Sequence, residues 1–341
     1  MKKTTRFTAL LLVVVMLVQT FAFAAQISDF GDFPKNSWST EAVTAAVENG
    51  LLIGRGNNKL DPKGLLTRAE MAAIMTRAFG ATVEKDISSF EDVKDDEWYY
   101  PVVAKAYNML VMQGTGDNTF SPKNNTSREE VFLSLARVLH IDSEEYSVLD
   151  KFSDKADIAD WSKNALTGMV GDEYLNGYKD GTLRPKGKIT REELAQVFHN
   201  IFKTYISEPG TYSSVAPAGS VIIRSPGVTL ENVTINGDLV LADGIGAGDC
   251  RINNVTVNGR IIVRGGEGTV YFVNVKSTGK VIINDVNGTV NFHNYRTDVP
   301  FKDNLIENTP ATFLKPTGGG FGGGPGGGGA ITHYITFKKP K

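Results

Sequence analysis

Cysteine and histidine are scarce in this chain of 341 residues, which contains one cysteine and four histidines. The single Cys250 excludes an internal disulfide, so hydrophobic cores must hold the folded chain together. No histidine or aspartate pattern accompanies Cys250, and we predict a small buried core residue instead of a nucleophile. No pattern in the sequence indicates a metal or a cofactor, and neither is expected.

An excess of positive charge is also missing. The chain has 36 Lys and Arg against 38 Asp and Glu, and without Lys2, Lys3 and Arg6 of a predicted leader the balance is 33 to 38. Nucleic acids are bound through concentrated positive charge, so this mild negative balance argues against a nucleic-acid partner.

Long apolar runs are missing outside the first residues of the chain. Three basic residues, an apolar run at 9–18 and small residues up to Ala24 have the layout of a secretory signal peptide over residues 1–24. No other stretch approaches the ~20 apolar residues that a membrane helix needs. The mature chain is therefore expected to be secreted, without insertion into a membrane.

An internal repeat is the strongest feature that the sequence does have. Tryptophan, proline and arginine recur together, at intervals of 60 and 63 residues. The three sets are Trp38, Trp98 and Trp161; Pro62, Pro122 and Pro185; and Arg68, Arg128 and Arg191. They predict three copies of one unit at residues 28–80, 88–141 and 150–206, here called repeats 1, 2 and 3.

Each repeat is predicted to contain an opening Phe-x-Asp, with Asp32, Asp92 or Asp154, and then two helices. Apolar residues recur with a helical period along each second helix. These stripes are Met71, Ile74, Met75, Ala78 and Phe79; Val131, Leu135, Val138 and Leu139; and Leu194, Val197, Phe198, Ile201 and Phe202. We expect the three faces to be buried together in one helical bundle.

The combination of Phe-x-Asp, Trp, Gly-x-Gly, Pro and Thr-Arg-Ala-Glu resembles the S-layer homology domain. The last motif stands here as Thr67-Arg68-Ala69-Glu70, Ser127-Arg128-Glu129-Glu130 and Thr190-Arg191-Glu192-Glu193. The resemblance implies a pseudo-threefold spindle, whose grooves hold a secondary cell-wall polysaccharide attached to peptidoglycan and commonly bearing pyruvate ketals. It also implies a location in the cell wall or S layer, where other surface proteins are further partners.

The arginine of this motif has two open interpretations. The hydroxyl residue and the glutamate around it form a capping box, which satisfies N–H groups at a helix start. The arginine itself faces the positive end of the helix dipole, at a cost of about 0.3–1 kcal/mol, and calls for an anion. We predict that Arg68, Arg128 and Arg191 bind carboxylates of the polysaccharide beside free helix N–H groups. The alternative is a buried ion pair with the opening Asp32, Asp92 or Asp154 of a neighbouring repeat.

The tryptophans also have two open interpretations. Trp38, Trp98 and Trp161 each open a helix, where a tryptophan is either part of the core or a platform for stacking a sugar. With the three arginines and the three opening aspartates, they are the candidate polysaccharide-binding residues. Repeat 3 has Gly177-Tyr178-Lys179-Asp180-Gly181 where the others have Gly-x-Gly, which leaves the number of binding grooves open.

The C-terminal half has short alternating runs of Val, Ile, Asn and Gly, which predict an all-β segment. Asn232, Asn254, Asn274 and Asn294 follow at intervals of 22, 20 and 20 residues. This spacing predicts a small β-solenoid over residues 215–312 with stacked, buried Asn side chains, and a short β-sandwich is the alternative. We assign the acidic residues beside glycines to turns, namely Asp238, Asp243, Asp249 and Asp285. Residues 313–341 are predicted to be a Gly-rich flexible tail.

A non-catalytic surface-anchoring protein is the function that these patterns favour, with the β domain as a spacer or an interaction surface. No catalytic residue is predicted. A wall-anchored polysaccharide-degrading enzyme is one alternative, and it would need closely set carboxylates on the solenoid. A subunit of an S-layer or filament lattice is the other, and it would need exposed apolar edges.

Overall fold

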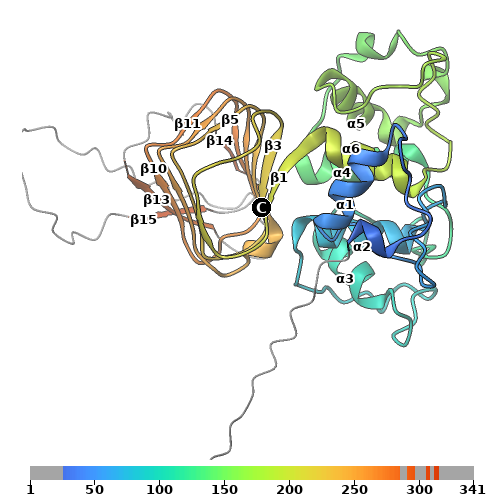
Figure 1. Cartoon of the computed structure of the whole chain (residues 1–341), viewed down its shortest axis with the longest axis horizontal. Coiled ribbons are helices and arrows are strands. Elements are labelled where there is room, and N and C mark those ends of the chain that lie inside the picture. The colour runs from blue at the N-terminus through green and yellow to red at the C-terminus, as the bar shows by residue number, and fades with distance from the viewer. Residues whose placement is uncertain (1–25, 285–289, 296–304, 308–310, 315–341) are drawn as a thin grey trace, which may run out of the picture.

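The computed structural model describes residues 26–284 in full and the backbone of three further strands at 290–295, 305–307 and 311–314. Six helices lie on one side of the molecule and a stack of β coils on the other (Figure 1). The predicted signal peptide at 1–24, Asp285 and residues 315–341 of the predicted tail lie outside the described residues. Residues 313 and 314, which were also assigned to the tail, end the last described strand.

The six α-helices form one bundle shared by the three repeats, as predicted. Their bounds are α1 Thr40–Glu48, α2 Arg68–Phe79, α3 Tyr100–Asn108, α4 Arg128–Leu139, α5 Asp160–Gly171 and α6 Arg191–Ile201. The first helix of each repeat packs on the second helix of the repeat before it, so that α3 contacts α2, α5 contacts α4, and α1 contacts α6. Because α1 closes on α6, the three repeats form a ring. Among the described helices, none is long and apolar enough to cross a bilayer.

Short 3-10 helices and capping boxes complete the helical half. The 3-10 helices are η1 Ile27–Asp29, η2 Tyr146–Leu149 and η3 Lys155–Asp157, and η4 Asp243–Ile245 lies in the β half. The predicted capping boxes are all present at the starts of α2, α4 and α6, where Thr67, Ser127 and Thr190 each exchange hydrogen bonds with the glutamate three residues later. The starts of the second helices are therefore set by local sequence.

The β half is a parallel β-solenoid, as predicted, built from three sheets. The bundle-facing sheet contains β1 Phe202–Ile206, β3 Ser220–Ile223, β6 Leu239–Leu241, β9 Ile261–Val263, β12 Val281–Ile283 and β14 Leu305–Glu307. The distal sheet contains β2 Gly210–Tyr212, β4 Val228–Glu231, β7 Cys250–Asn253, β10 Val270–Val273, β13 Val290–Tyr295 and β15 Ala311–Leu314. A short corner sheet contains β5 Thr234–Ile235, β8 Thr256–Val257 and β11 Lys276–Ser277.

The solenoid starts earlier than residue 215. Strand β1 follows α6 directly and pairs in parallel with β3, so Phe202 is the first residue of a strand and not part of the helical stripe to which we assigned it. Its backbone is extended, and its ring packs edge-on against Phe79 of α2. Phe202 therefore keeps its predicted place in the core while the chain around it changes from helix to sheet.

The bundle-facing sheet is buried on both sides. Its strands carry three apolar residues in a row, and the middle ones pack into the core of the helical bundle. These middle residues are Ile222, Val240, Ile262 and Ile282. Their neighbours on either side point into the solenoid and form its own core with the distal sheet, including the buried Cys250. Burial raises the pKa of the Cys250 thiol to about 12, which agrees with an inert core residue.

Stacked asparagines mark one corner of the solenoid. The Asn254 amide donates to Asn232 at 2.8 Å, and Asn274 donates to Asn254 at 2.7 Å. The three residues have left-handed backbone angles, with φ from 51° to 56°, a conformation that asparagine tolerates well. The predicted column thus exists, but it is exposed and not buried. Asn294 does not continue it, because Asn294 pairs with Phe272 inside a strand, two positions out of register with Asn274.

Glycines form a second column at the next turn of each coil. A Cβ atom on Gly259 would lie 2.4 Å from the carbonyl oxygen of Gly237, and one on Gly279 would lie 2.7 Å from that of Gly259. No side chain fits at these distances, so successive coils come this close only through glycine.

Arginines join the solenoid to the helical bundle. The Arg224 guanidinium donates to the carbonyl oxygens of Arg77 and Asn49, at the ends of α2 and α1. Arg264 donates to Met109 O at the end of α3 at 3.0 Å, and Arg260 donates to Leu139 O at the end of α4 at 3.4 Å. Four helix C-termini, whose carbonyls attract positive charge, are thus held by side chains of the solenoid.

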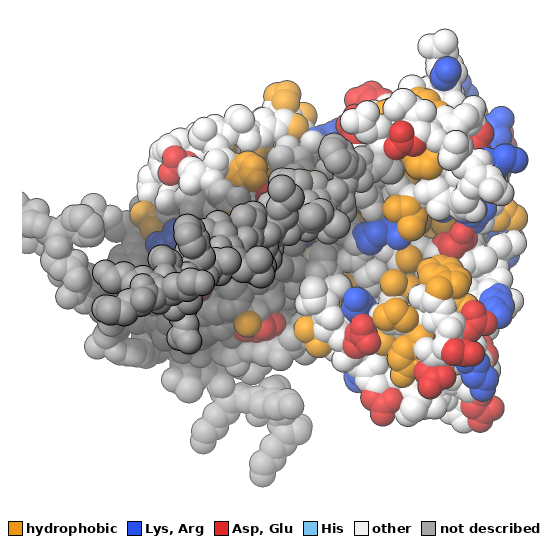
Figure 2. Space-filling view, turned by 60° about the horizontal axis from the view of Figure 1, so that its bottom comes forward, with side chains coloured by type: hydrophobic (Ala, Val, Ile, Leu, Met, Phe, Trp, Pro, Cys, Tyr) orange, Lys and Arg blue, Asp and Glu red, His pale blue; other side chains and the backbone are white. Residues whose placement is uncertain are grey.

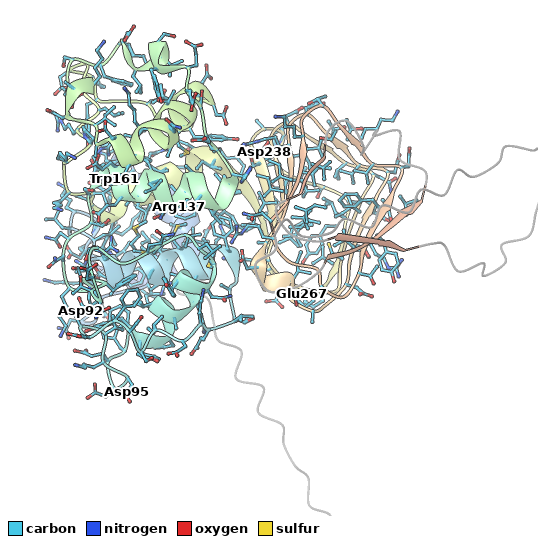
Figure 3. All side chains as sticks on the ribbon, turned by 180° about the vertical axis from the view of Figure 1, so that it is seen from behind. Asp92, Asp95, Arg137, Trp161, Asp238 and Glu267 are labelled. Carbon is cyan, nitrogen blue, oxygen red and sulfur yellow. The ribbon has the colours of Figure 1, made fainter. Side chains whose placement is uncertain are left out.

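Two aspartates assigned to turns have a different role at this junction. Asp243 forms a bidentate pair with Arg264, at 2.8 and 3.0 Å, and both side chains are almost fully buried. Asp238 pairs with Arg260 at 2.6 Å and accepts from the Tyr174 hydroxyl of repeat 3 (Figure 3). Our assignment of Asp238 and Asp243 to turn chemistry alone was wrong, because each offsets the charge of an arginine that is buried between the two halves.

Candidate functional site: the grooves between the repeats

The three motif arginines are buried and bind backbone carbonyls of the next repeat. Arg68, Arg128 and Arg191 are 6%, 6% and 3% exposed. Their Nε atoms donate to Phe120 O at 2.8 Å, Leu183 O at 3.1 Å and Leu60 O at 2.9 Å, respectively. Repeat 1 thus holds repeat 2, repeat 2 holds repeat 3, and repeat 3 holds repeat 1.

The opening aspartates stabilise the loops that supply these carbonyls. Asp32 accepts from the backbone N–H groups of Leu60 and Asp61, at 2.7 and 2.9 Å. Asp92 binds residues 120 and 121, and Asp154 binds residues 183 and 184, in the same way. Burial acts to raise the pKa of Asp32, but these two N–H donors outweigh it and lower the pKa. The aspartate and the arginine therefore meet through a shared loop and do not form the direct ion pair that we considered.

The first N–H groups of the second helices are not free. Arg68 N donates to Asn124 O and Ala69 N donates to Pro122 O, both at 2.9 Å. The first two N–H groups of α4 and α6 are bound by carbonyls of repeats 3 and 1 in the same manner. The expectation of free helix N–H groups beside the arginine was wrong, because the next repeat supplies the capping carbonyls that a local view of the sequence leaves out.

Each motif arginine also faces the capping-box glutamate of the next repeat. Arg68 Nη1 lies 2.8 Å from Glu130, whereas Arg128 and Arg191 lie 3.7 and 4.0 Å from Glu193 and Glu70. The residue after the loop glycine differs in the three grooves. Arg55 binds Glu70 through two nitrogens, the Tyr178 hydroxyl donates to Glu193, and Thr115 occupies the matching position in repeat 2.

The tryptophans lie on the surface. Trp38, Trp98 and Trp161 are 61%, 61% and 55% exposed, so the core interpretation was wrong for all three. Figure 2 shows apolar side chains reaching this surface of the bundle between charges of both signs. A ring that is bound at the start of a helix and open to solvent can stack on a sugar face.

Each tryptophan lines a separate cavity between repeats. Trp38 borders a groove of about 560 Å³ together with Arg128, Tyr178, Arg184 and Gln196. Trp98 borders a cavity of about 210 Å³ with Ala69 and Lys123, and Trp161 borders one of about 520 Å³ with Arg137. Only the first cavity is lined by one of the predicted arginines.

Glutamates fill the position of Ala69 in the other two repeats. Glu192 accepts from Ser39 at 2.6 Å, and Glu129 accepts from Ser162 at 3.0 Å and from Lys186 at 2.7 Å. Ala69 leaves this space open beside Trp98, where Lys123 lies 2.7 Å from Glu97. The three grooves are therefore unlike in shape and charge. Lys123, Tyr178 and Arg184 were not among the predicted site residues, although the departure at Gly177 to Gly181 pointed to the last two.

Comparison with known proteins agrees with this geometry. Residues 29–72, 89–132 and 151–195 each match the family model of the S-layer homology domain. The chain is similar to the Surface-layer 125 kDa protein of Lysinibacillus sphaericus, with 28% identity over 218 residues, covering 63% of this chain and 18% of that protein. It is similar to the S-layer protein sap of Bacillus anthracis, with 28% identity over 193 residues, covering 56% and 23%.

An enzyme is also among the relatives. The Endoglucanase of Bacillus sp. (strain KSM-635) is 25% identical over 248 residues, covering 69% of this chain and 26% of that protein. The chain thus spans about a fifth to a quarter of the length of these three relatives. With three matched segments and a closed ring of three repeats, the chain carries three tandem S-layer homology domains and belongs through them to this family of cell-surface anchoring modules.

Proposed function

We propose that the grooves between the three S-layer homology domains bind a secondary cell-wall polysaccharide and hold this chain on the cell surface without a covalent bond. The observation that carries the proposal is one exposed tryptophan in each of three cavities between repeats. An exposed indole gains little from its own fold, and it offers an apolar face of the size of a sugar ring.

The groove at Trp38 has the chemistry best suited to an acidic sugar. The Tyr178 ring lies between two guanidinium groups, with Arg128 at 4.6 Å and Arg184 at 3.9 Å from its centre. Burial and the hydrogen bond to Glu193 raise the pKa of Tyr178 to about 12, so the hydroxyl stays protonated as a donor. Stacked cations of this kind can bind a carboxylate, such as that of a pyruvate ketal, next to the aromatic face.

Arg128 is the motif arginine with the most capacity for a ligand. Arg68 uses all three of its nitrogens in protein contacts, and Arg191 makes two hydrogen bonds to carbonyls. Arg128 makes one hydrogen bond, through Nε, among the described residues. We therefore assign ligand contact to Arg128 first and a mainly structural role to Arg68.

The solenoid is proposed to be a rigid, non-catalytic platform. An enzyme acting on polysaccharide needs a pair of carboxylates that are free to exchange protons. Asp238 and Asp243 are engaged in ion pairs with arginines. Secretion by the predicted signal peptide remains part of the proposal, since the wall lies outside the membrane.

The test is sedimentation of the full chain with native wall sacculi, before and after chemical removal of pyruvate ketals. We expect Trp38→Ala to weaken binding by about two- to tenfold, the range for one aromatic stacking contact. Val83→Ala is the matched control, because Val83 is also an exposed apolar residue but lines none of the three cavities. Equal binding by the Trp38 variant and the control would contradict the proposal. Unchanged binding after ketal removal would exclude the pyruvyl carboxylate as the ligand.

A second test separates the arginines. Arg128→Lys keeps the charge but loses the bidentate fork, so binding to sacculi should fall. Arg68→Lys should lower the melting temperature and leave the affinity of the folded protein unchanged, because its contacts are within the protein. Loss of affinity in the Arg68 variant alone would reverse this assignment.

A further inference from the structure

The cavity at Trp161 differs from the grooves that contain the family motif. It has a volume of about 520 Å³ and is lined by the second half of α4, the first turns of α5, the turn at Met109 and Leu110, and Asn284 of the solenoid. None of the three motif arginines lines it. The site is thus formed jointly by repeats 2 and 3 and the β half.

An uncommitted arginine lies in this cavity. Arg137 is half-buried, and among the described residues its guanidinium makes no hydrogen bond or ion pair. Its counterpart in repeat 1, Arg77, donates twice to Leu51 O, at 3.1 and 2.8 Å. Burial alone lowers the pKa of Arg137, with no acidic side chain acting against it. A partly desolvated guanidinium without an acceptor favours an anionic ligand.

The other lining residues suit a sugar. Trp161 offers an exposed ring, and Figure 3 places it on the same face of the bundle as Arg137. The Asn164 side-chain oxygen accepts from the Tyr146 hydroxyl at 2.7 Å, which holds this amide in place. Asp142 and Asp160 lie exposed at the rim, where solvent screens their charge and they can accept from sugar hydroxyls.

The solenoid adds positive charge to the floor of the cavity. Burial lowers the pKa of His140, and Arg260, Arg264 and Lys280 lower it further, against an opposing effect of Asp142. All three basic residues come from the solenoid. The cavity therefore has an electropositive base, an aromatic wall and a polar rim.

We propose that this cavity is a second carbohydrate site, which binds one acidic sugar unit with Trp161 stacked on its ring and Arg137 on its carboxylate. The proposal rests on the proposed function only in so far as the wall polysaccharide supplies that sugar. A polymer held here and in the groove at Trp38 would cross the junction between the helical bundle and the solenoid.

Tryptophan fluorescence gives a direct test, because the chain has three tryptophans. In the full chain with Trp38→Phe and Trp98→Phe, Trp161 is the sole reporter. We expect D-glucuronate to change its emission in a saturable way, and D-glucose to bind at least about tenfold more weakly, because it lacks the carboxylate. Arg137→Gln should weaken glucuronate binding by a similar factor, and Arg137→Lys should restore part of it.

Arg251→Gln is the matched control, since Arg251 is an exposed arginine on the distal sheet. A response to glucuronate that Arg137→Gln abolishes and Arg251→Gln preserves supports the site. No response, an equal response to glucose, or an equal response in the Arg137 variant overturns it. Binding to sacculi is not measured here, so a failure of this site and a failure of the wall-binding grooves are distinguishable.

Discussion

The helical repeats and the solenoid coils are both repetitive, but they solve the problem of their ends differently. The three repeats close on themselves, because Arg191 of the last binds Leu60 O of the first. The coils stack in a row, and each is bound only to the coils before and after it. A ring distributes its contacts over pairs that are far apart in the sequence, whereas a stack uses contacts about 20 residues apart.

The two designs are joined by a third kind of contact. One flank of the solenoid is buried in the core of the bundle, and four helix ends accept from its arginines. The comparison therefore teaches that the β half is a structural part of the ring and not a spacer on a flexible linker. Four substitutions or conditions test this difference, and the largest effect is expected at the junction.

Asp243→Ala should cost the most, about 3–5 kcal/mol, because it leaves the buried Arg264 without a counter-charge. Unfolding in urea is followed by tryptophan fluorescence, which reports only on the helical repeats. A shift of that transition shows that the halves unfold together. The control is Asp249→Ala, an exposed aspartate of the same loop. An unshifted tryptophan transition in the Asp243 variant would show that the two halves are independent.

Arg68→Gln should destabilise the ring by about 1.5–3 kcal/mol, the range for hydrogen bonds to charged groups. Arg191→Gln should cost less, because Glu70 keeps both contacts with Arg55. Urea unfolding of the two variants measures the difference. Equal losses would show that the carbonyl contacts, and not the glutamate pairs, close the ring.

Asn254→Ala should cost about 1–2 kcal/mol, since Asn254 both donates to Asn232 and accepts from Asn274 and has a left-handed backbone. Asn254→Gly keeps the backbone conformation and loses only the two amide contacts, so it should cost less. Thermal unfolding of both variants separates the two contributions. If the glycine variant is as unstable as the alanine variant, the amide column alone accounts for the loss.

Mild acid should produce the smallest effect, and it should act on the helical half. Burial lowers the pKa of His140 and of His199 below the ordinary value of about 6.5. The unfolded chain then binds more protons, so the free energy of unfolding falls as the pH drops below 6.5 towards the folded-state pKa values. Urea unfolding at pH 7.5 and 5.5 tests this, and His140→Asn with His199→Asn should flatten the dependence. An unchanged slope in the double variant would assign it to other groups.

Local features of the bundle could be predicted from the sequence. The capping boxes at Thr67, Ser127 and Thr190 depend on residues three positions apart, and all three are present. The surroundings of the arginines could not be predicted in the same way. The carbonyl that Arg68 binds lies 52 residues away in another repeat, and backbone oxygens have no signature in a sequence.

The solenoid was predictable in its period and not in its partner. The spacing of Asn232, Asn254 and Asn274 correctly indicated a column, but a shift of two residues removed Asn294 from it. A signal for the docked flank was present, because runs of three apolar residues such as 239–241 and 261–263 fit a strand that is buried on both faces. Arg264 directly after such a run could have identified the junction.

The arginine contacts at the helix ends also govern how tension passes through the molecule. A pull on the solenoid loads the hydrogen bonds of Arg224, Arg260 and Arg264 at the same moment, because they hold different helices and not one linker. Bonds that share a load break together instead of one after another. The junction should therefore behave as a stiff joint, and a molecule fixed to a wall by its grooves would keep its solenoid at a constant angle under flow.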